Sequence, residues 1–277
     1  SSTSRGLGDV YKRQDVTPER DGKRLIVQPN TFNMYCHREP RFYLTVVWNG
    51  QWFKWENRNT NFLYGQPDGG PTHDAPQNGY LNRSRVSLDY IPRDNNHPYR
   101  PAIIFRMAEA YLSYAEALNE SSERMSHKQE ILDNLNKIRH RAGIAEYGTG
   151  TDENGFTRIK INFSDQKEVR RLIHKERRVE FVGEGVRYHD LRRWKTAHYG
   201  IGNLNEQGEN PDWGVNGPDY GMNYYGTEYT DQGDNAFFKR TKYMDRVYPR
   251  KFYWYPIHQS EIDKDPTLVQ GPFWLGE

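Results

Sequence analysis

Three glutamates stand at intervals of four residues, at Glu176, Glu180 and Glu184. On a helix, this spacing brings neighbouring carboxylates to about 6 Å, within the separation of about 5–10 Å that glycoside hydrolases use between their two carboxyl groups. A carboxylate that is paired with arginine, however, has a low pKa and is a poor general acid. We therefore favour ion pairs that lock helices together over catalysis at these glutamates. The arginines close by in the sequence are Arg177, Arg178, Arg187, Arg192 and Arg193.

Aromatic and polar side chains are mixed in two other segments, residues 48–64 and 211–229. A sugar ring has an apolar face, which Trp and Tyr cover, and a rim of hydroxyls, which amides and charged groups bind. The same rings could instead fill the core of a loop-rich domain, and both interpretations stay open for each ring. The candidate ligand-binding residues are Trp52, Trp55, Trp213, Tyr220, Asn223, Tyr224 and Tyr225.

Other kinds of catalytic site find little support in the sequence. The nine histidines are scattered and form no His-Glu-x-x-His motif, so we expect no metal and no cofactor. The single cysteine, Cys36, precedes His37, but adjacent side chains of an extended segment point apart, which argues against a thiol nucleophile. No complete glycine-rich phosphate loop is present.

The elements that would position these residues are mostly helical. Apolar residues at helical spacing predict a helix over 101–120 and a second over about 127–142, with Ser126 and Gln129 as a capping box and Gly143 as its stop. A third helix begins near Asp165, and a short one follows through Leu191 and Trp194. The two helical pairs, about 101–143 and 165–195, have the size of tetratricopeptide repeats and should stack as repeat units do.

The remaining segments are predicted to be irregular or extended. Residues 42–48 are β-branched and aromatic and precede Asn49-Gly50, which predicts a strand and a hairpin turn. Residues 200–250 combine glycines with aromatic rings and follow no sustained period, so we expect a long structured loop there.

Composition limits the class of function. Lys and Arg total 39 and Asp and Glu total 37, and basic residues are not concentrated on any segment, which argues against binding of nucleic acid. No run approaches the roughly 20 apolar residues of a membrane-spanning helix. Residues 1–14 resemble read-through from a sequencing adapter, so we expect them to be non-native.

Four segments resemble motifs of the SusD/RagB family, in the order in which that family has them. They are residues 106–119 (RMAEAYLSYAEALN), 135–144 (LNKIRHRAGI), 176–194 (ERRVEFVGEGVRYHDLRRW) and 256–270 (PIHQSEIDKDPTLVQ). In the last segment, His258 stands where the family usually has a second proline. The resemblance implies a structural role for the motif residues Glu109, Glu116, Arg139, Glu176, Arg177, Glu180, Glu184, Arg187, Asp190 and Arg193.

The resemblance implies a mainly α-helical fold of tetratricopeptide-like pairs with a loop-rich ligand-binding portion. Residues 15–277 would then be the C-terminal portion of a single SusD/RagB-like domain, whose N-terminal lipid anchor is missing from this chain. It also implies a non-enzymatic lipoprotein on the extracellular face of a Gram-negative outer membrane. Such proteins bind an oligosaccharide and deliver it to a SusC-type TonB-dependent transporter.

Three alternatives stay open from the sequence. Some RagB-like proteins serve peptide uptake, so the ligand could be a peptide. A tetratricopeptide-like scaffold could bind a protein partner in its helical groove, although simple repeat arrays have shorter connections than residues 200–250. A glycoside hydrolase could use Glu176 or Glu180.

Overall fold

The computed structural model describes residues 31–53, 56–84, 86, 95, 99, 102–200 and 214–274, together with three short N-terminal strands. These strands are β1 (Arg13–Gln14), β2 (Arg20–Asp21) and β3 (Arg24–Leu25). The chain divides into two compact units: residues 1–184 with 221–241, and residues 185–220 with 242–277. Whether residues 15–277 make one domain, and whether residues 1–14 are non-native, stay predictions.

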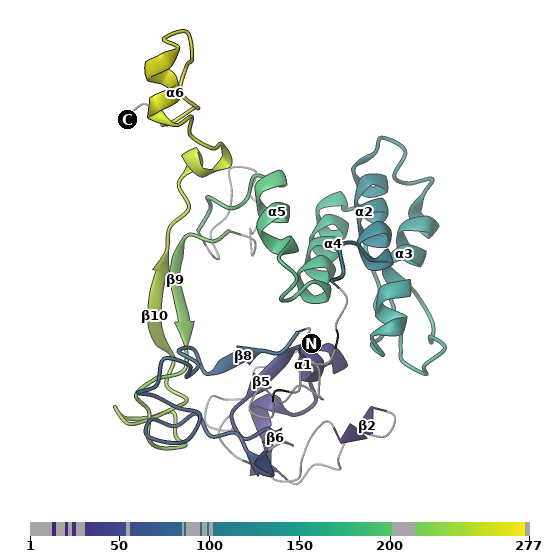
Figure 1. Cartoon of the computed structure of the whole chain (residues 1–277). Helices are drawn as coiled ribbons and strands as arrows, with labels where there is room; N and C mark the ends of the chain where they lie inside the picture. The colour runs from purple at the N-terminus through teal and green to yellow at the C-terminus, as the bar shows by residue number, and fades with distance from the viewer. Residues whose placement is uncertain are drawn as a thin grey trace. The chain divides into compact units, whose positions relative to one another are not determined.

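Three helices form one part of the first unit: α2 (Met107–Glu120), α3 (Lys128–Arg141) and α4 (Gln166–Glu180). Figure 1 shows α2 between the other two, and it packs against both. Their apolar stripes meet in the interior, where Leu112, Ala115, Leu135 and Ile173 are fully buried. Ala115 lets the helices approach closely, because it has no side chain beyond Cβ. Of the predicted second pair, α4 packs against α2 as expected, whereas the short helix that follows it belongs to the second unit.

The helix ends follow local chemistry, and two of our predictions were wrong. The Asp165 carboxylate accepts hydrogen bonds from the backbone N–H groups of Lys167 and Glu168 and begins α4, as predicted. The predicted capping box is absent, because Ser126 donates its hydroxyl to the Glu123 carbonyl oxygen. The predicted helix over 101–120 begins only at Met107, because Arg106 is extended and directs its guanidinium to α4.

Short strands and a short helix form the other part of the first unit. They are η2 (Asn33–Tyr35), α1 (Pro40–Thr45), β4 (Thr31–Phe32), β5 (Val46–Trp48), β6 (Trp52–Phe53), β7 (Arg58–Asn59) and β8 (Tyr80–Asn82). β5 pairs with β8, and β6 pairs with β7, both antiparallel. The predicted strand over 42–48 was wrong for its first four residues, which belong to a helix that has Pro40 in its first turn. The predicted hairpin at Asn49-Gly50 was also wrong, because β5 pairs with β8 and not with the strand that follows this turn.

An aromatic core holds this part together. Tyr35, Tyr43, Trp48 and Phe62 pack in it with Phe237, which comes from the second half of the chain. Trp48 is 2% exposed and stacks on Phe42, with ring centroids 5.5 Å apart. Aromatic pairs of this kind stabilise a core beyond the area that they bury.

The second unit contains α5 (Val186–Arg193), η5 (Arg250–Tyr253), α6 (Gln259–Lys264) and most of the paired strands β9 (Gly217–Gly221) and β10 (Thr241–Arg246). Leu191, Ala197 and Tyr248 form its core. The prediction of one long loop over 200–250 was wrong where β9 and β10 form, and residues 201–213 lie outside the described residues. The fold is mainly helical with few short strands, as predicted. No helix in the described part of the chain is long and apolar enough to cross a membrane.

Candidate ligand-binding site

A cavity of about 330 Å³ opens beside β5, β6 and β8 in the first unit, and we call it the Trp52 cavity. Its volume lies in the range of about 300–1,000 Å³ that is typical of small-molecule sites. Its walls come from three stretches, residues 47–62, 67–75 and 81–86. Figure 1 shows the strands β5, β6 and β8 close together in this part of the unit.

Large apolar side chains line the Trp52 cavity. Trp52 is 43% exposed and Phe53 is 36% exposed, although both rings belong to a paired strand. Leu81 on β8 and Val86 also line the cavity and are exposed. Exposed aromatic rings that border a concave surface are a common binding feature, since they bury apolar area only when a ligand is present.

Polar groups lie in the same cavity. The Gln51 Oε1 atom is buried and has no hydrogen-bond partner among the described residues. Asp74 is exposed at the wall, as is Thr72. Burial alone would raise the pKa of Asp68, but hydrogen bonds from Arg58 and the Asn61 backbone outweigh it and lower that pKa. The cavity therefore presents hydrogen-bond acceptors, carboxylates among them, beside aromatic rings.

The wall that carries Trp52 is held by short hydrogen bonds. The turn after β5 uses Gly50 at φ +87°, a conformation that favours glycine. The Asn49 side-chain oxygen accepts from the Phe62 N–H at 2.7 Å, and the Thr60 hydroxyl donates to the Trp48 carbonyl at 2.8 Å. These bonds tie both ends of the β6–β7 hairpin to the aromatic core, which fixes the position of Trp52.

Three of the predicted residues lie in the loop that follows β9. Tyr224 packs against Gly70, where an added Cβ would come within 2.5 Å of the tyrosine ring, and it donates to the Thr72 carbonyl at 3.4 Å. Tyr224 thus supports a residue of the cavity wall. Tyr225 is 68% exposed and lies edge-on to Tyr224 at 5.1 Å.

Asn223 has a different role from that of Tyr224 and Tyr225, because it makes only contacts within its own loop. Its side chain is buried, and its amide donates to the carbonyl oxygens of Asp234 and Ala236. The side-chain oxygen accepts from the Tyr225 N–H. These contacts make Asn223 a residue that closes the 223–236 loop, and it does not line the Trp52 cavity.

The other predicted residues are not brought to the cavity. Tyr220 is exposed on β9 and belongs to the second unit. Trp55 and Trp213 lie outside the described residues. Sequence reasoning missed Gln51, Asp74 and Arg83, which all line the cavity. Gln51 and Phe53 could have been found as the sequence neighbours of Trp52, whereas no sequence signal places Asp74 or Arg83 there.

The glutamates spaced by four make ion pairs in the interior of the first unit. Glu176 is bound by Arg41 at 2.7 Å and by Arg139 at 3.0 Å. Glu180 is bound by Arg41 at 3.1 Å, by Arg106 at 2.5 Å and by Arg141. Glu184 pairs with Arg106 at 2.8 Å. None of these arginines is among those that we had expected as partners. Arg41 lies on α1, Arg106 directly precedes α2, and α3 carries Arg139 and Arg141.

Four of the other motif residues make charge contacts within their own unit. Glu116 and Arg177 are buried, with 3.9 Å between the carboxylate and guanidinium, and Arg177 donates to the Ser113 hydroxyl. Asp190 pairs with Arg193 at 2.9 Å on α5. Glu109 is half-buried on α2, and Arg187 lies on α5. No group of three or more His, Cys, Asp or Glu in the described chain could hold a metal ion.

The pairing of Glu180 predicts a loss of stability in acid. Burial by itself raises its pKa, but hydrogen bonds from Arg106 and Arg141 outweigh burial and lower the pKa below the ordinary 4.5. The stabilisation is therefore present above pH 4.5 and is lost as the pH falls through the lower folded pKa.

We expect the unfolding free energy of the wild-type chain to fall more steeply between about pH 5 and about pH 3 than that of Glu180→Gln. Urea denaturation at each pH measures this difference. Glu109→Gln should follow the wild-type curve, because the Glu109 carboxylate makes no ion pair with a described residue. Parallel curves for wild type and Glu180→Gln would show that the pairing does not stabilise the fold.

The chain is similar to several known proteins. It is 32% identical over 109 residues to SusD-like protein P25 and 32% identical over 103 residues to SusD-like protein P38, both from Formosa agariphila. A crystal structure of the SusD-like protein BF3747 from Bacteroides fragilis aligns with a TM-score of 0.61 and 27% identity, over 88% of this chain. A structure of BT4246 in its selenomethionine form aligns with a TM-score of 0.66 and 22% identity, over 99% of this chain.

These relatives are longer than the chain. The alignments cover 18% and 19% of the two Formosa proteins, and 40% and 42% of the two solved chains. The model of the SusD family matches residues 7–274, which include all four sequence motifs. The predicted resemblance is confirmed by this match, and the chain belongs to the SusD family.

Proposed function

We propose that this chain captures an oligosaccharide in the Trp52 cavity, without covalent chemistry. The observation that carries the proposal is an exposed Trp52 beside a buried, unpartnered acceptor on Gln51 in one preformed cavity. An indole ring covers the apolar face of a sugar, and an acceptor that lacks a donor is satisfied by a hydroxyl of the same sugar.

The wider role is proposed from membership of the family. The chain would be part of a lipoprotein on the outer surface of a Gram-negative outer membrane, anchored by an N-terminal lipid, and would deliver its ligand to a SusC-type TonB-dependent transporter. Catalysis at the glutamates is disfavoured, because Glu176 and Glu180 are bound by arginines and the pKa of Glu180 is lowered. A general acid needs the opposite shift.

Replacement of Gln51 shows whether this side chain acts in ligand binding or in folding. Gln51→Met keeps the length of the side chain and removes the buried acceptor. We expect glycan affinity to fall by about threefold to tenfold, which corresponds to one hydrogen bond. The thermal midpoint should stay unchanged or rise, since an unsatisfied acceptor costs free energy in the unbound state. A fall in the midpoint with unchanged affinity would show that Gln51 acts in folding alone.

A panel of neutral and acidic polysaccharides tests the proposal as a whole. Affinity gels that contain each polysaccharide measure retardation of the wild-type chain, with Leu44→Ala as a control at an exposed apolar residue away from the cavity. Retardation by one polysaccharide class, unchanged in the control, supports capture of glycan. If no polysaccharide retards the chain and a peptide library yields a ligand, the proposal fails in favour of peptide uptake.

A further inference from the structure

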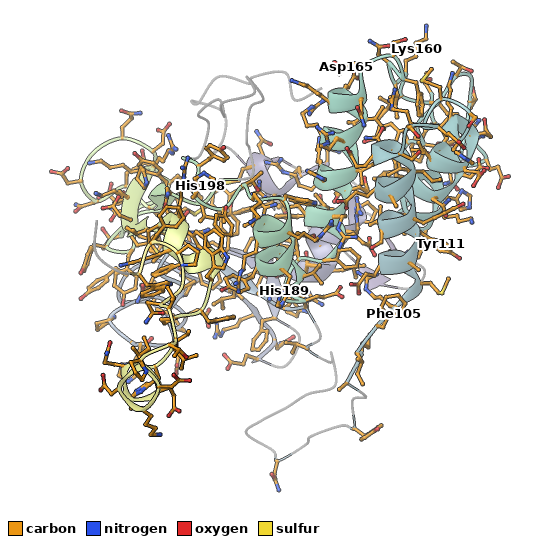
Figure 2. All side chains as sticks on the ribbon, turned by 90° about the horizontal axis from the view of Figure 1, so that it is seen from above. Phe105, Tyr111, Lys160, Asp165, His189 and His198 are labelled. Atoms are coloured by element: carbon orange, nitrogen blue, oxygen red, sulfur yellow. The ribbon has the colours of Figure 1, made fainter. Side chains whose placement is uncertain are left out.

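A second concave surface lies in the first unit, on α3 and the loop of residues 145–163, and we call it the α3 groove. Its volume is about 870 Å³, and it shares no lining residue with the Trp52 cavity. Tyr111 of α2 closes it on one side, and Lys160 lies on the loop. Figure 2 labels both residues on the ribbon of this unit.

The loop that forms one wall of the α3 groove is tied to α3. The Asn136 side chain bonds both backbone groups of Tyr147, donating to its carbonyl at 2.9 Å and accepting from its N–H at 2.8 Å. Arg139 donates to the Ala145 carbonyl at 2.6 Å. Inside the loop, Asp152 accepts from the backbone of Glu146, Asn154 and Phe156. A groove whose walls are held in this way is available before a ligand arrives.

The charges of the α3 groove leave lysines without acidic partners. Arg158 pairs with Glu146 at 2.9 Å, so these two charges compensate each other. Lys128, Lys137 and Lys160 line the groove and make no ion pair with a carboxylate among the described residues. Two of the ammonium groups rest on aromatic rings, Lys137 over Tyr111 at 4.5 Å and Lys128 over Phe163 at 5.2 Å.

Hydrogen-bond acceptors and donors line the α3 groove together with these lysines. Asp133 and Glu153 line the same groove, together with Gln129. A ligand that satisfies the whole groove needs anionic groups for the lysines and hydroxyl donors for the two carboxylates. An acidic saccharide carries both on each repeating unit. An acidic peptide carries the anions but would set its carboxylates against Asp133 and Glu153 without hydroxyls to offer them.

We propose that the α3 groove is a second binding site, which takes an acidic saccharide whose carboxylate or sulfate groups pair with Lys128, Lys137 and Lys160. This site does not depend on the capture of glycan at the Trp52 cavity, and either proposal can fail while the other stands.

Calorimetric titration of the 277-residue chain tests the second site. The probe is a short oligogalacturonate, and its methyl-esterified form is the matched control, because it keeps the sugar backbone and loses the charge. A sulfated oligosaccharide of similar length distinguishes sulfate from carboxylate as the anion. The variant is Lys128→Gln combined with Lys137→Gln, both at exposed positions, with the exposed α4 residue Lys175→Gln as the matched control outside the groove.

We expect the acid form to bind, and the double variant to lose about fivefold in affinity, as two exposed ion pairs would contribute. The wild-type chain should bind the ester no more tightly than the double variant binds the acid form. Raising the salt concentration from about 50 mM to about 500 mM should weaken binding of the acid form. Lys175→Gln should leave this titration unchanged. Binding of the sulfated probe alone would keep the site and assign sulfate as its anion.

Equal affinity for acid and ester, or acid binding that the double variant does not weaken, would overturn the proposal. Binding of a polyglutamate peptide, weakened by the double variant while neither saccharide binds, would also overturn it and make the groove a peptide site. Loss of oligogalacturonate binding in Trp52→Ala, with no effect of the lysine changes, would assign acidic saccharide to the Trp52 cavity instead.

Discussion

Glu176→Gln is expected to lower the free energy of unfolding by about 3–5 kcal/mol, because the buried Arg139 loses its ion-pair partner and Arg41 keeps only Glu39 and Glu180. The side chains of Arg41 and Arg139 are 11% and 10% exposed, and both bind the Glu176 carboxylate. Glutamine keeps the size of the side chain and one acceptor oxygen but removes the charge. Urea denaturation of the wild type and the variant, followed by circular dichroism of the helices, measures the loss.

Glu109→Gln is the control for this experiment. Glu109 is half-buried on α2, and its carboxylate makes no ion pair with a described residue. We expect its substitution to change stability by less than about 0.5 kcal/mol. A loss of similar size in both variants would mean that any helical carboxylate matters equally, and that the buried ion pairs have no special role.

Trp48→Ala is expected to cost about 3–5 kcal/mol of stability, the usual range for deletion of a buried aromatic side chain. Trp48 is 2% exposed and contacts Tyr35, Phe42 and Tyr43 in the aromatic core. Alanine keeps the backbone carbonyl that accepts from Thr60, but it removes the ring that packs with Phe62 in the aromatic core, so the adjoining β6–β7 hairpin and the wall of the Trp52 cavity should also become more mobile. Thermal denaturation measures the first effect, and proteolysis within residues 50–60 measures the second.

Trp52→Ala is the matched control for Trp48→Ala, since it removes the same side chain four positions later. Trp52 is 43% exposed, and its loss should change the unfolding free energy by less than about 0.5 kcal/mol. If Trp52→Ala destabilised the chain as much as Trp48→Ala, the exposed ring would belong to the core of the protein.

The helices could be predicted from the sequence because their apolar residues recur at helical spacing. The ends were harder to predict. Asp165 caps α4 as expected, whereas Ser126 bonds to the preceding turn and Arg106 leaves the helix to reach Glu180. In both failures, a side chain found a partner that competes with the local helix signal.

The buried ion pairs could also be predicted only in part from the sequence. The glutamates at intervals of four indicated ion pairs, but Arg41 is separated from Glu176 by 135 residues along the chain. The fold brings them together by joining α1 to α4 through the ion pairs of Arg41. The types of residue in the network were thus visible in the sequence, and its principal partners were not.

Burial decides which aromatic rings can bind a ligand, and sequence patterns do not report burial in irregular segments. Trp48 and Trp52 stand four residues apart around the same turn, and only one is exposed. Asn223 and Tyr225 are only two residues apart, yet Asn223 is buried in the loop that it closes and Tyr225 lies on the surface. Asp74 joins the cavity through a loop that has no repeating pattern.

The central claim, that Trp52 binds the ligand, is tested most directly by calorimetric titration with the glycan that the panel identifies. Wild type, Trp52→Phe and Trp52→Ala are compared, after circular dichroism shows that all three are folded. We expect Trp52→Ala to lose about threefold to tenfold in affinity, the range of one aromatic contact, and Trp52→Phe to lose less. Unchanged affinity in folded Trp52→Ala would contradict the assignment of the Trp52 cavity as the glycan site.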